Sequence, residues 1–147
     1  MSLEIRRLQA EDIPHLLPME QEAFSVPWSE GNFRALLDKD TYLYLVALSE
    51  GIPVGICGMI MVCGEGDIDK VLVDPGHRGQ GIGKTLLQEL LQQGQQKGFA
   101  DFTLEVRVSN TPAIRLYEQA GFVSEGIRPG FYDKPKEDAM IMWKRRG

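Results

Sequence analysis

The chain has 147 residues, of which 43% are hydrophobic and 25% are charged, and its formal net charge is −5. This length and balance exclude a disordered chain and predict one folded domain, residues 1–147. The apolar runs are much shorter than the ~20 residues that cross a membrane, and an acidic chain lacks the basic surface that nonspecific nucleic-acid binding needs. We therefore expect neither a membrane nor a nucleic acid as a partner.

The first predicted elements are a strand and two helices. Residues 3–8 form an apolar strand pattern, and the helical period of apolar residues over 10–24 predicts a helix. Ser29 is the predicted N-cap of a second helix. Trp28 and Phe33 lie on either side of this cap. They form either a wall of a substrate site or a hydrophobic staple between the two helices.

Three strands follow, over residues 41–48, 54–63 and 67–73. Turns rich in glycine and proline separate them, at 50–53 and 64–66. Short turns join antiparallel neighbours, so this part of the chain predicts a meander.

Cys57 and Cys63 lie together in the second of these strands, and the two histidines, His15 and His77, lie far from them in the chain. Metal ligands are grouped at short spacings, so we expect no metal site. Two thiols in an apolar segment are typical of buried, unpaired cysteines. Such cysteines predict a cytoplasmic protein.

A glycine-rich loop follows the strand at 67–73 and opens an amphipathic helix at 81–97. It reads Arg78-Gly79-Gln80-Gly81-Ile82-Gly83-Lys84. Backbone N–H groups at a helix start are unpaired and carry the positive end of the helix dipole, and glycines let an anion approach them. The spacing matches neither the Walker loop nor the dinucleotide loop. The stretch is therefore a phosphate-binding loop of another kind, or a glycine-rich turn that only reverses the chain.

The last predicted elements are a strand at 101–108, a helix that starts after Asn110, and strands at 123–132 and 139–143. The strand at 101–108 alternates strictly, so Glu105 lies on the face opposite its apolar residues. Asn110 precedes Thr111 and Pro112, which is typical of a helix cap.

The complete order is β-α-α-β-β-β-α-β-α-β-β. It predicts an α/β (α+β) fold with a mixed central sheet of about seven strands and helices on both faces. A crossover through the helix at 81–97 makes the strands at 67–73 and 101–108 parallel neighbours. The basic C-terminal residues 144–146 are read as a short solvated tail.

The glycine loop and the element order resemble the GNAT N-acetyltransferase family over nearly the whole chain. In that family the strands corresponding to 67–73 and 101–108 splay apart, the first of them is bulged, and acetyl-coenzyme A lies between them with its pyrophosphate on the loop. Asn110 either binds the pantetheine arm or is only a helix cap. The cofactor contacts that the resemblance implies come from Val71, Leu72, Val73, Arg78, Gly79, Gln80, Gly81, Ile82, Gly83, Lys84 and Asn110.

Glu105 and Tyr117 are the candidate catalytic pair. Acetyl transfer to an amine needs a base for the ammonium proton and an acid for the departing thiolate. Considered alone, Glu105 is a surface glutamate paired with Arg107, and Tyr117 is a core side chain. The resemblance implies that Glu105 is the base and Tyr117 the acid. A backbone N–H within 71–73 is then the candidate donor to the oxyanion.

A narrower resemblance points to the RimI-type enzymes, bacterial alanine N-acetyltransferases that modify the N-terminus of a small-subunit ribosomal protein. It implies acetyl-coenzyme A as cosubstrate, a ribosomal-protein N-terminus as partner, and Trp28 and Tyr132 as substrate-binding residues. Lys70 and Asp133 depart from the pattern of that group and leave the peptide preference open. The resemblance rests on residues 24–33, 104–110, 113–122 and 137–142.

Two other functions remain open from the sequence. A small-molecule amine acetyltransferase would share the fold and the cosubstrate but would need a closed acidic pocket. A non-catalytic module that binds coenzyme A would need no catalytic pair. Direct transfer without an acyl-enzyme is expected, because Cys57 and Cys63 have no histidine nearby in the sequence to activate them.

Overall fold

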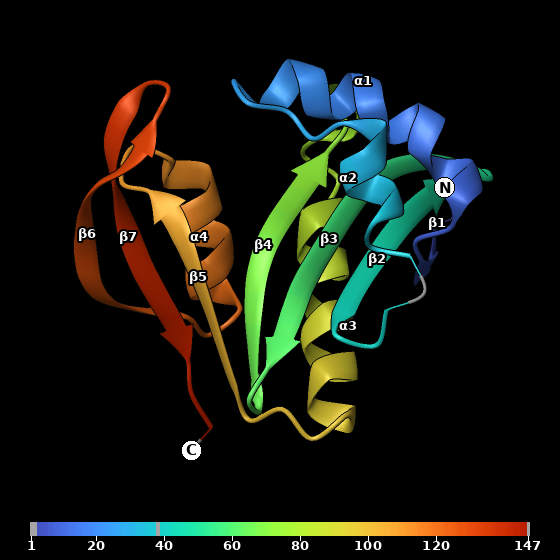
Figure 1. The fold of residues 1–147 in the computed structure, drawn as a ribbon. Coiled ribbons are helices and arrows are strands. Elements are labelled where there is room, and N and C mark those ends of the chain that lie inside the picture. The colour runs from blue at the N-terminus through green and yellow to red at the C-terminus, as the bar shows by residue number, and fades with distance from the viewer. Residues whose placement is uncertain (1–2, 38, 147) are drawn as a thin grey trace.

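The computed structural model describes residues 3–37 and 39–146. Within them, a mixed sheet of seven strands runs in the order β1-β2-β3-β4-β5-β7-β6, with helices on both faces (Figure 1). The expected fold class and element order are confirmed. The strands are β1 (Leu3–Arg7), β2 (Tyr42–Ser49), β3 (Ile52–Val62), β4 (Glu65–Val73), β5 (Asp101–Arg107), β6 (Val123–Asp133) and β7 (Lys136–Lys144). The helices are α1 (Ile13–Ala23), α2 (Glu30–Arg34), α3 (Ile82–Gln96) and α4 (Thr111–Gln119), with short 3₁₀ turns η1 (Ala10–Asp12) and η2 (Pro75–His77).

β4 and β5 are the parallel neighbours that the sequence predicts. Their pairing joins Glu65–Ile68 to Asp101–Leu104. Past this point the two strands diverge (Figure 1), because β4 stays paired with β3 as far as Val73 whereas β5 stays paired with β7 as far as Arg107. The splayed strands that the family resemblance implies are therefore present.

A β-bulge lies in β4 where this divergence begins. Ile68 pairs with Met59 of β3, and Lys70 pairs with Gly58. Asp69 is therefore the extra residue of the bulge. The bulge turns Asp69 and Lys70 to the same face of the sheet, where they contact β2 and α1 respectively.

The sheet separates two hydrophobic cores. On one face, the apolar stripe of α3 is fully buried, including Leu86, Leu87 and Leu90. On the other face, α1 and α2 cover the sheet with buried side chains such as Leu16 and Phe33. Burying one such side chain contributes about 1.5–3 kcal/mol. The two cores therefore hold β2, β3 and β4 firmly between helices.

Two turns are shorter than the sequence predicts. The turn predicted at 64–66 consists of Cys63 and Gly64, which have φ angles of 51° and 80°, and β4 already begins at Glu65. β3 begins at Ile52, within the other predicted turn. Cross-strand pairing extends both strands beyond what the residue pattern alone indicates.

The two cysteines lie in different environments. Cys57 is buried, as predicted, but Cys63 is exposed, so the expectation of two buried thiols is wrong. Cys63 follows the last residue of β3 and points away from both cores because it belongs to the turn.

Two expectations from the sequence concern membrane helices and metal sites, and they can be compared with the described residues only. None of their helices is long and apolar enough to cross a membrane. No group of three histidine, cysteine, aspartate or glutamate side chains in that part of the chain is arranged to hold a metal ion.

Candidate active site

The glycine loop presents the start of α3 to solvent. Gly79 and Gly81 have φ angles of 79° and 78°, which favour glycine, and a Cβ at either position would meet no atom within 4 Å. The amide of Thr85 is the first in α3 to bond back, to the carbonyl of Gly81 at 3.0 Å. The amides of residues 82–84 therefore precede the helical hydrogen bonds and are donors for an anion.

Cationic side chains flank these amides. Arg78, Gln80 and Lys84 are exposed, and Arg78 and Lys84 bring positive charge to the helix start. A phosphate group gains from both the dipole of α3 and these charges. The loop therefore fits the pyrophosphate that the family resemblance implies.

Both ends of the loop are anchored. Asp74 accepts hydrogen bonds from the amide of Gly76 at 3.2 Å and from Nδ1 of His77 at 2.9 Å, which fixes the turn after β4. At the other end, Ile82 is 2% exposed and lies in the core. A Cβ at Gly83 would lie 3.6 Å from Cγ2 of Val73, so α3 starts close to the end of β4.

Residues 71–73 of β4 form one side of the divergence. Leu72 is buried under α1 and α2, whereas Val71 and Val73 are half-buried and pack toward α3. On the β3 side their backbone is paired up to Val73. The pairing with β5 ends at Ile68, so the opposite backbone edge of this segment faces the divergence.

Glu105 lies on β5, on the face opposite Leu104. Its Oε2 is 3.2 Å from Nη1 of Arg128 on β6, and the Glu105 side chain is 22% exposed. The pairing with Arg107 considered from the sequence is wrong. The Arg107 guanidinium instead lies 4.3 Å from the Tyr132 ring and pairs with Glu137 at 3.3 Å.

Tyr117 lies on α4 and packs into the core on the α3 side of the sheet. Its ring centroid is 5.9 Å from that of Phe122, and the residue is 8% exposed, as its position on the apolar stripe predicts. Burial raises the pKa of Tyr117, and the nearby Cys57 and Tyr132 raise it further. Tyr117 therefore keeps its proton at neutral pH.

Tyr132 links the two candidate catalytic residues. Burial raises the pKa of Tyr132, and the charge of Glu105 adds to this effect. Tyr132 in turn raises the pKa of Tyr117. Glu105 and Tyr117 belong to opposite faces of the sheet, and Tyr132 interacts electrostatically with both.

Asn110, Trp28 and Phe33 each have the structural role that the sequence offered as one of two readings. Oδ1 of Asn110 accepts from the amide of Ala113 at 3.3 Å, so Asn110 caps α4. The Trp28 and Phe33 rings meet edge to face at 5.3 Å on either side of the Ser29 cap, which is the hydrophobic staple. Trp28 remains half-buried.

A buried ion pair beside the bulge was not predicted from the sequence. Nζ of Lys70 lies 2.6 Å from both carboxylate oxygens of Glu20, and the two side chains are 4% and 1% exposed. The amide of Trp28 also donates to Glu20, at 3.1 Å, and the Trp28 ring lies 3.9 Å from Nζ. Burial lowers the pKa of Lys70, and Glu20 opposes this effect. The pair fixes the α1–α2 loop against β4.

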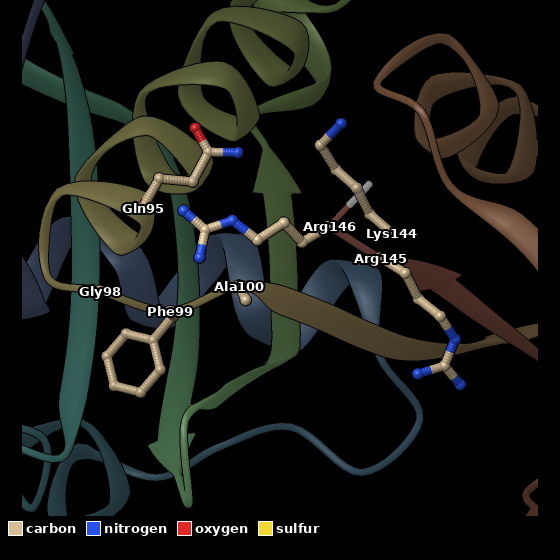
Figure 2. Close-up of a pocket in the computed structure, with 7 residues that line it drawn as sticks. All are labelled: Gln95, Gly98, Phe99, Ala100, Lys144, Arg145 and Arg146. Atoms are coloured by element: carbon tan, nitrogen blue, oxygen red, sulfur yellow. The ribbon is translucent and has the colours of Figure 1, made fainter.

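A surface cavity of about 350 Å³ lies at the opposite end of α3 (Figure 2). The residues 144–146, expected to be a solvated tail, line it together with the end of α3. Arg145 already bonds Glu125 at 2.8 and 2.9 Å, and cations suit the negative end of a helix. We therefore place the candidate site at the glycine loop and the strand divergence. The cavity is lined by Gln95, Gly98, Phe99, Ala100, Lys144, Arg145 and Arg146.

Comparison with known proteins identifies the family of the chain. Residues 13–122 match the model of the acetyltransferase (GNAT) family. The chain is 36% identical over 140 residues to the ribosomal protein bS18-alanine N-acetyltransferase of Escherichia coli (strain K12), covering 94% of both chains. The crystal structure of the ribosomal-protein-S18-alanine N-acetyltransferase from Escherichia coli matches with a TM-score of 0.89 and 34% identity, over 98% of this chain and 94% of that one. The structure of Arabidopsis thaliana NAA60 in complex with acetyl-CoA shares the fold, with a TM-score of 0.88 at 18% identity over 97% of each chain.

Proposed function

The chain belongs to the acetyltransferase (GNAT) family, and we propose that it acetylates the N-terminal α-amine of a protein, the alanine of ribosomal protein bS18. The observation that carries this proposal is the exposed start of α3 beside the divergence of β4 and β5. The choice of substrate rests on the names of relatives that share 34–36% identity with almost the entire chain.

Acetyl-coenzyme A is the proposed cosubstrate, and the glycine loop is its anchor. The amides of residues 82–84, with Arg78 and Lys84, hold the pyrophosphate. Gly79 and Gly81 keep the approach free of side chains, and Gln80 borders it. Residues 71–73 run beside the pantetheine arm and present backbone donors at the divergence. The side-chain amide of Asn110 is a further candidate contact to that arm.

Glu105 is the proposed base. The α-ammonium of a peptide has an ordinary pKa of about 8, so a nearby carboxylate removes its proton, directly or through one water, with little driving force. The free amine then attacks the thioester carbonyl. A backbone N–H of residues 71–73 donates to the oxyanion, the C–N bond forms, and the C–S bond breaks.

Tyr117 is the proposed acid for the thiolate that leaves. Its raised pKa, caused first by burial, keeps the phenol protonated until the thiolate develops beside it. Its place on the α3 side of the sheet, opposite Glu105, fits a mechanism in which the cofactor and the peptide approach from different faces.

Trp28 and Tyr132 are the proposed peptide contacts. Both are half-buried; the Trp28 ring lies beside Lys70 of the bulged strand, and Tyr132 is close enough to Glu105 to interact with its charge. Arg107 holds the Tyr132 ring by stacking at 4.3 Å. We also propose that residues 1–147 act as one domain in the cytoplasm, where ribosomal proteins are made.

A panel of peptides tests this function. The protein is incubated with acetyl-coenzyme A and with peptides that begin with Ala, Ser, Gly or Met, and one acetyl group on the α-amine of the alanine peptide is expected by mass spectrometry. Acetylation of free small amines in place of every peptide would favour the small-molecule enzyme. Binding of the cosubstrate without any transfer would favour the non-catalytic module.

A further inference from the structure

Asp69 lies where β4 begins to diverge from β5, directly after the last paired residue, Ile68. It is the extra residue of the β4 bulge, next to Lys70 and two residues before Val71, where the candidate oxyanion donors begin. The bulge turns its side chain to the α1 side of the sheet, which is the side on which Glu105 lies. A bulge often re-aims a side chain beside an active site.

Tyr44 reaches Asp69 across an intervening strand. Tyr44 belongs to β2 and Asp69 to β4, and their hydroxyl and carboxylate are hydrogen-bonded. The Tyr44 ring crosses β3 directly over Gly58, where an added Cβ would overlap it. Tyr44 is 3% exposed, so a buried phenol holds the carboxylate in a fixed position.

The nearby cationic side chains form ion pairs with other carboxylates. Arg128 bonds Glu105, and Lys70 bonds both oxygens of Glu20. The contact that the structure gives to the Asp69 carboxylate is the neutral Tyr44 hydroxyl. Asp69 is therefore an anion on the β4 side of the divergence, and Glu105 is an anion on the β5 side.

We propose that Asp69 is a second carboxylate of the active site, which binds the substrate α-ammonium from the β4 side, and that Tyr44 positions it. This inference rests on the proposed function. Asp69 holds the ammonium as an ion pair, and Glu105 takes its proton before the amine attacks the thioester. The requirement for an ammonium would select a free α-amine over a neutral N-terminus.

The charges around Asp69 predict how its binding depends on pH. Burial raises the pKa of Asp69 to about 6 and Asp67 also raises it, whereas the Tyr44 hydrogen bond and Lys70 lower it. Cys57 of β3 is the remaining titratable neighbour, and its own thiol is buried and protonated because burial raises its pKa. Ammonium binding needs the ionised carboxylate. The peptide KM should therefore rise as the pH falls through about 6.

Two variants test the proposal. Asp69→Asn removes the charge and keeps the shape. A charge-assisted hydrogen bond of the usual strength implies a peptide KM higher by roughly tenfold to a hundredfold, with the KM for acetyl-coenzyme A unchanged. The rise of KM near pH 6 should disappear in this variant. In Tyr44→Phe the same rise should move to higher pH, because the hydrogen bond that stabilises the charged form is gone.

A neutral inhibitor separates ion pairing from a general loss of structure. The inhibitor is the same peptide with a hydrogen in place of its α-amine, and its inhibition constant should not change in Asp69→Asn, because it has no group that can donate to the carboxylate. Glu65→Gln, at the start of the same strand, is the matched control and should change the peptide KM by less than about threefold. If the wild type acetylates the peptide and Asp69→Asn leaves its KM unchanged, or weakens binding of the peptide without the amine equally, the role of Asp69 is wrong. If the wild type acetylates no peptide, the proposed function itself fails.

Discussion

The two halves of the sheet are covered very differently. β2 and β3 lie between α3 on one face and α1 with α2 on the other, and most of their residues are buried. β6 is exposed along almost its whole length, and β5 and β7 are packed on one face by α4 (Figure 1). The covered half therefore carries the stability of the fold. The open half carries Glu105 and Tyr132, which we assign to the substrate.

The buried pair Glu20–Lys70 belongs to the covered half and should show the largest stability effect. Glu20→Ala leaves a buried lysine and the Trp28 amide without their partner, which is expected to cost about 3 kcal/mol of unfolding free energy. Denaturant unfolding measures this loss. Glu22→Ala, on the exposed side of the same helix, is the control and should change little.

A double substitution sharpens this result. Glu20→Leu combined with Lys70→Met replaces the pair with apolar side chains and should recover most of the stability, because the desolvation penalty of both charges disappears. A single Glu20→Ala variant as stable as the wild type would contradict the central place of this pair in the covered half.

Glu105→Gln should show the opposite behaviour, with a large loss of activity and a small loss of stability. Removal of a general base typically lowers kcat by a factor of 10² to 10⁴. The Arg128 partner is 55% exposed, so loss of the ion pair should hardly change the unfolding midpoint. Steady-state kinetics on an N-terminal peptide provide the test, with Glu125→Gln on β6 as control. A kcat that stays at the wild-type value would remove Glu105 from the mechanism.

Gly81 lies at the border between the two halves, and Gly81→Ala should have a moderate effect on stability and on the KM for acetyl-coenzyme A. Its φ of 78° is unfavourable for alanine by about 1 kcal/mol, although space for the Cβ is available. Relaxation of that strain moves the helix start, so the KM for acetyl-coenzyme A should rise. Gly51→Ala has a similar φ of 83° in a remote turn and should cost similar stability with an unchanged KM. Equal KM values in both variants would contradict a phosphate-binding role for the loop.

Substitutions in β6 should have the smallest effect. Val123 is 64% exposed, and Val123→Thr should change the unfolding free energy by no more than about 0.5 kcal/mol. Leu86→Ala in the covered half should cost about 2–5 kcal/mol, because Leu86 is fully buried. Thermal unfolding of the two variants compares the halves directly. A similar loss of unfolding free energy in both variants would contradict the assignment of the stability to the covered half.

Features that depend on local chemistry were predictable from the sequence. The glycine loop, the strict alternation around Glu105 and the caps at Ser29 and Asn110 each need only a few neighbouring residues. The splayed strands and the bulge followed from the resemblance to a family, because no local pattern encodes how far two strands diverge.

Features that depend on distant partners were not predictable. Tyr44 and Asp69 meet only because the bulge and Gly58 allow a ring to cross β3. The adjacent charges of Asp69 and Lys70, directly before the apolar run at 71–73, were an available signal of a buried polar network. The sequence offered Arg107, two positions away, as an alternative ion-pair partner of Glu105, but the partner is Arg128 on another strand, because β6 folds back beside β7.

The most direct test uses one peptide that begins with alanine and also contains an internal lysine. The wild-type protein and acetyl-coenzyme A should add a single acetyl group, and fragment masses should place it on the α-amine. Acetyl groups on the lysine side chain, with the α-amine left free, would contradict the account.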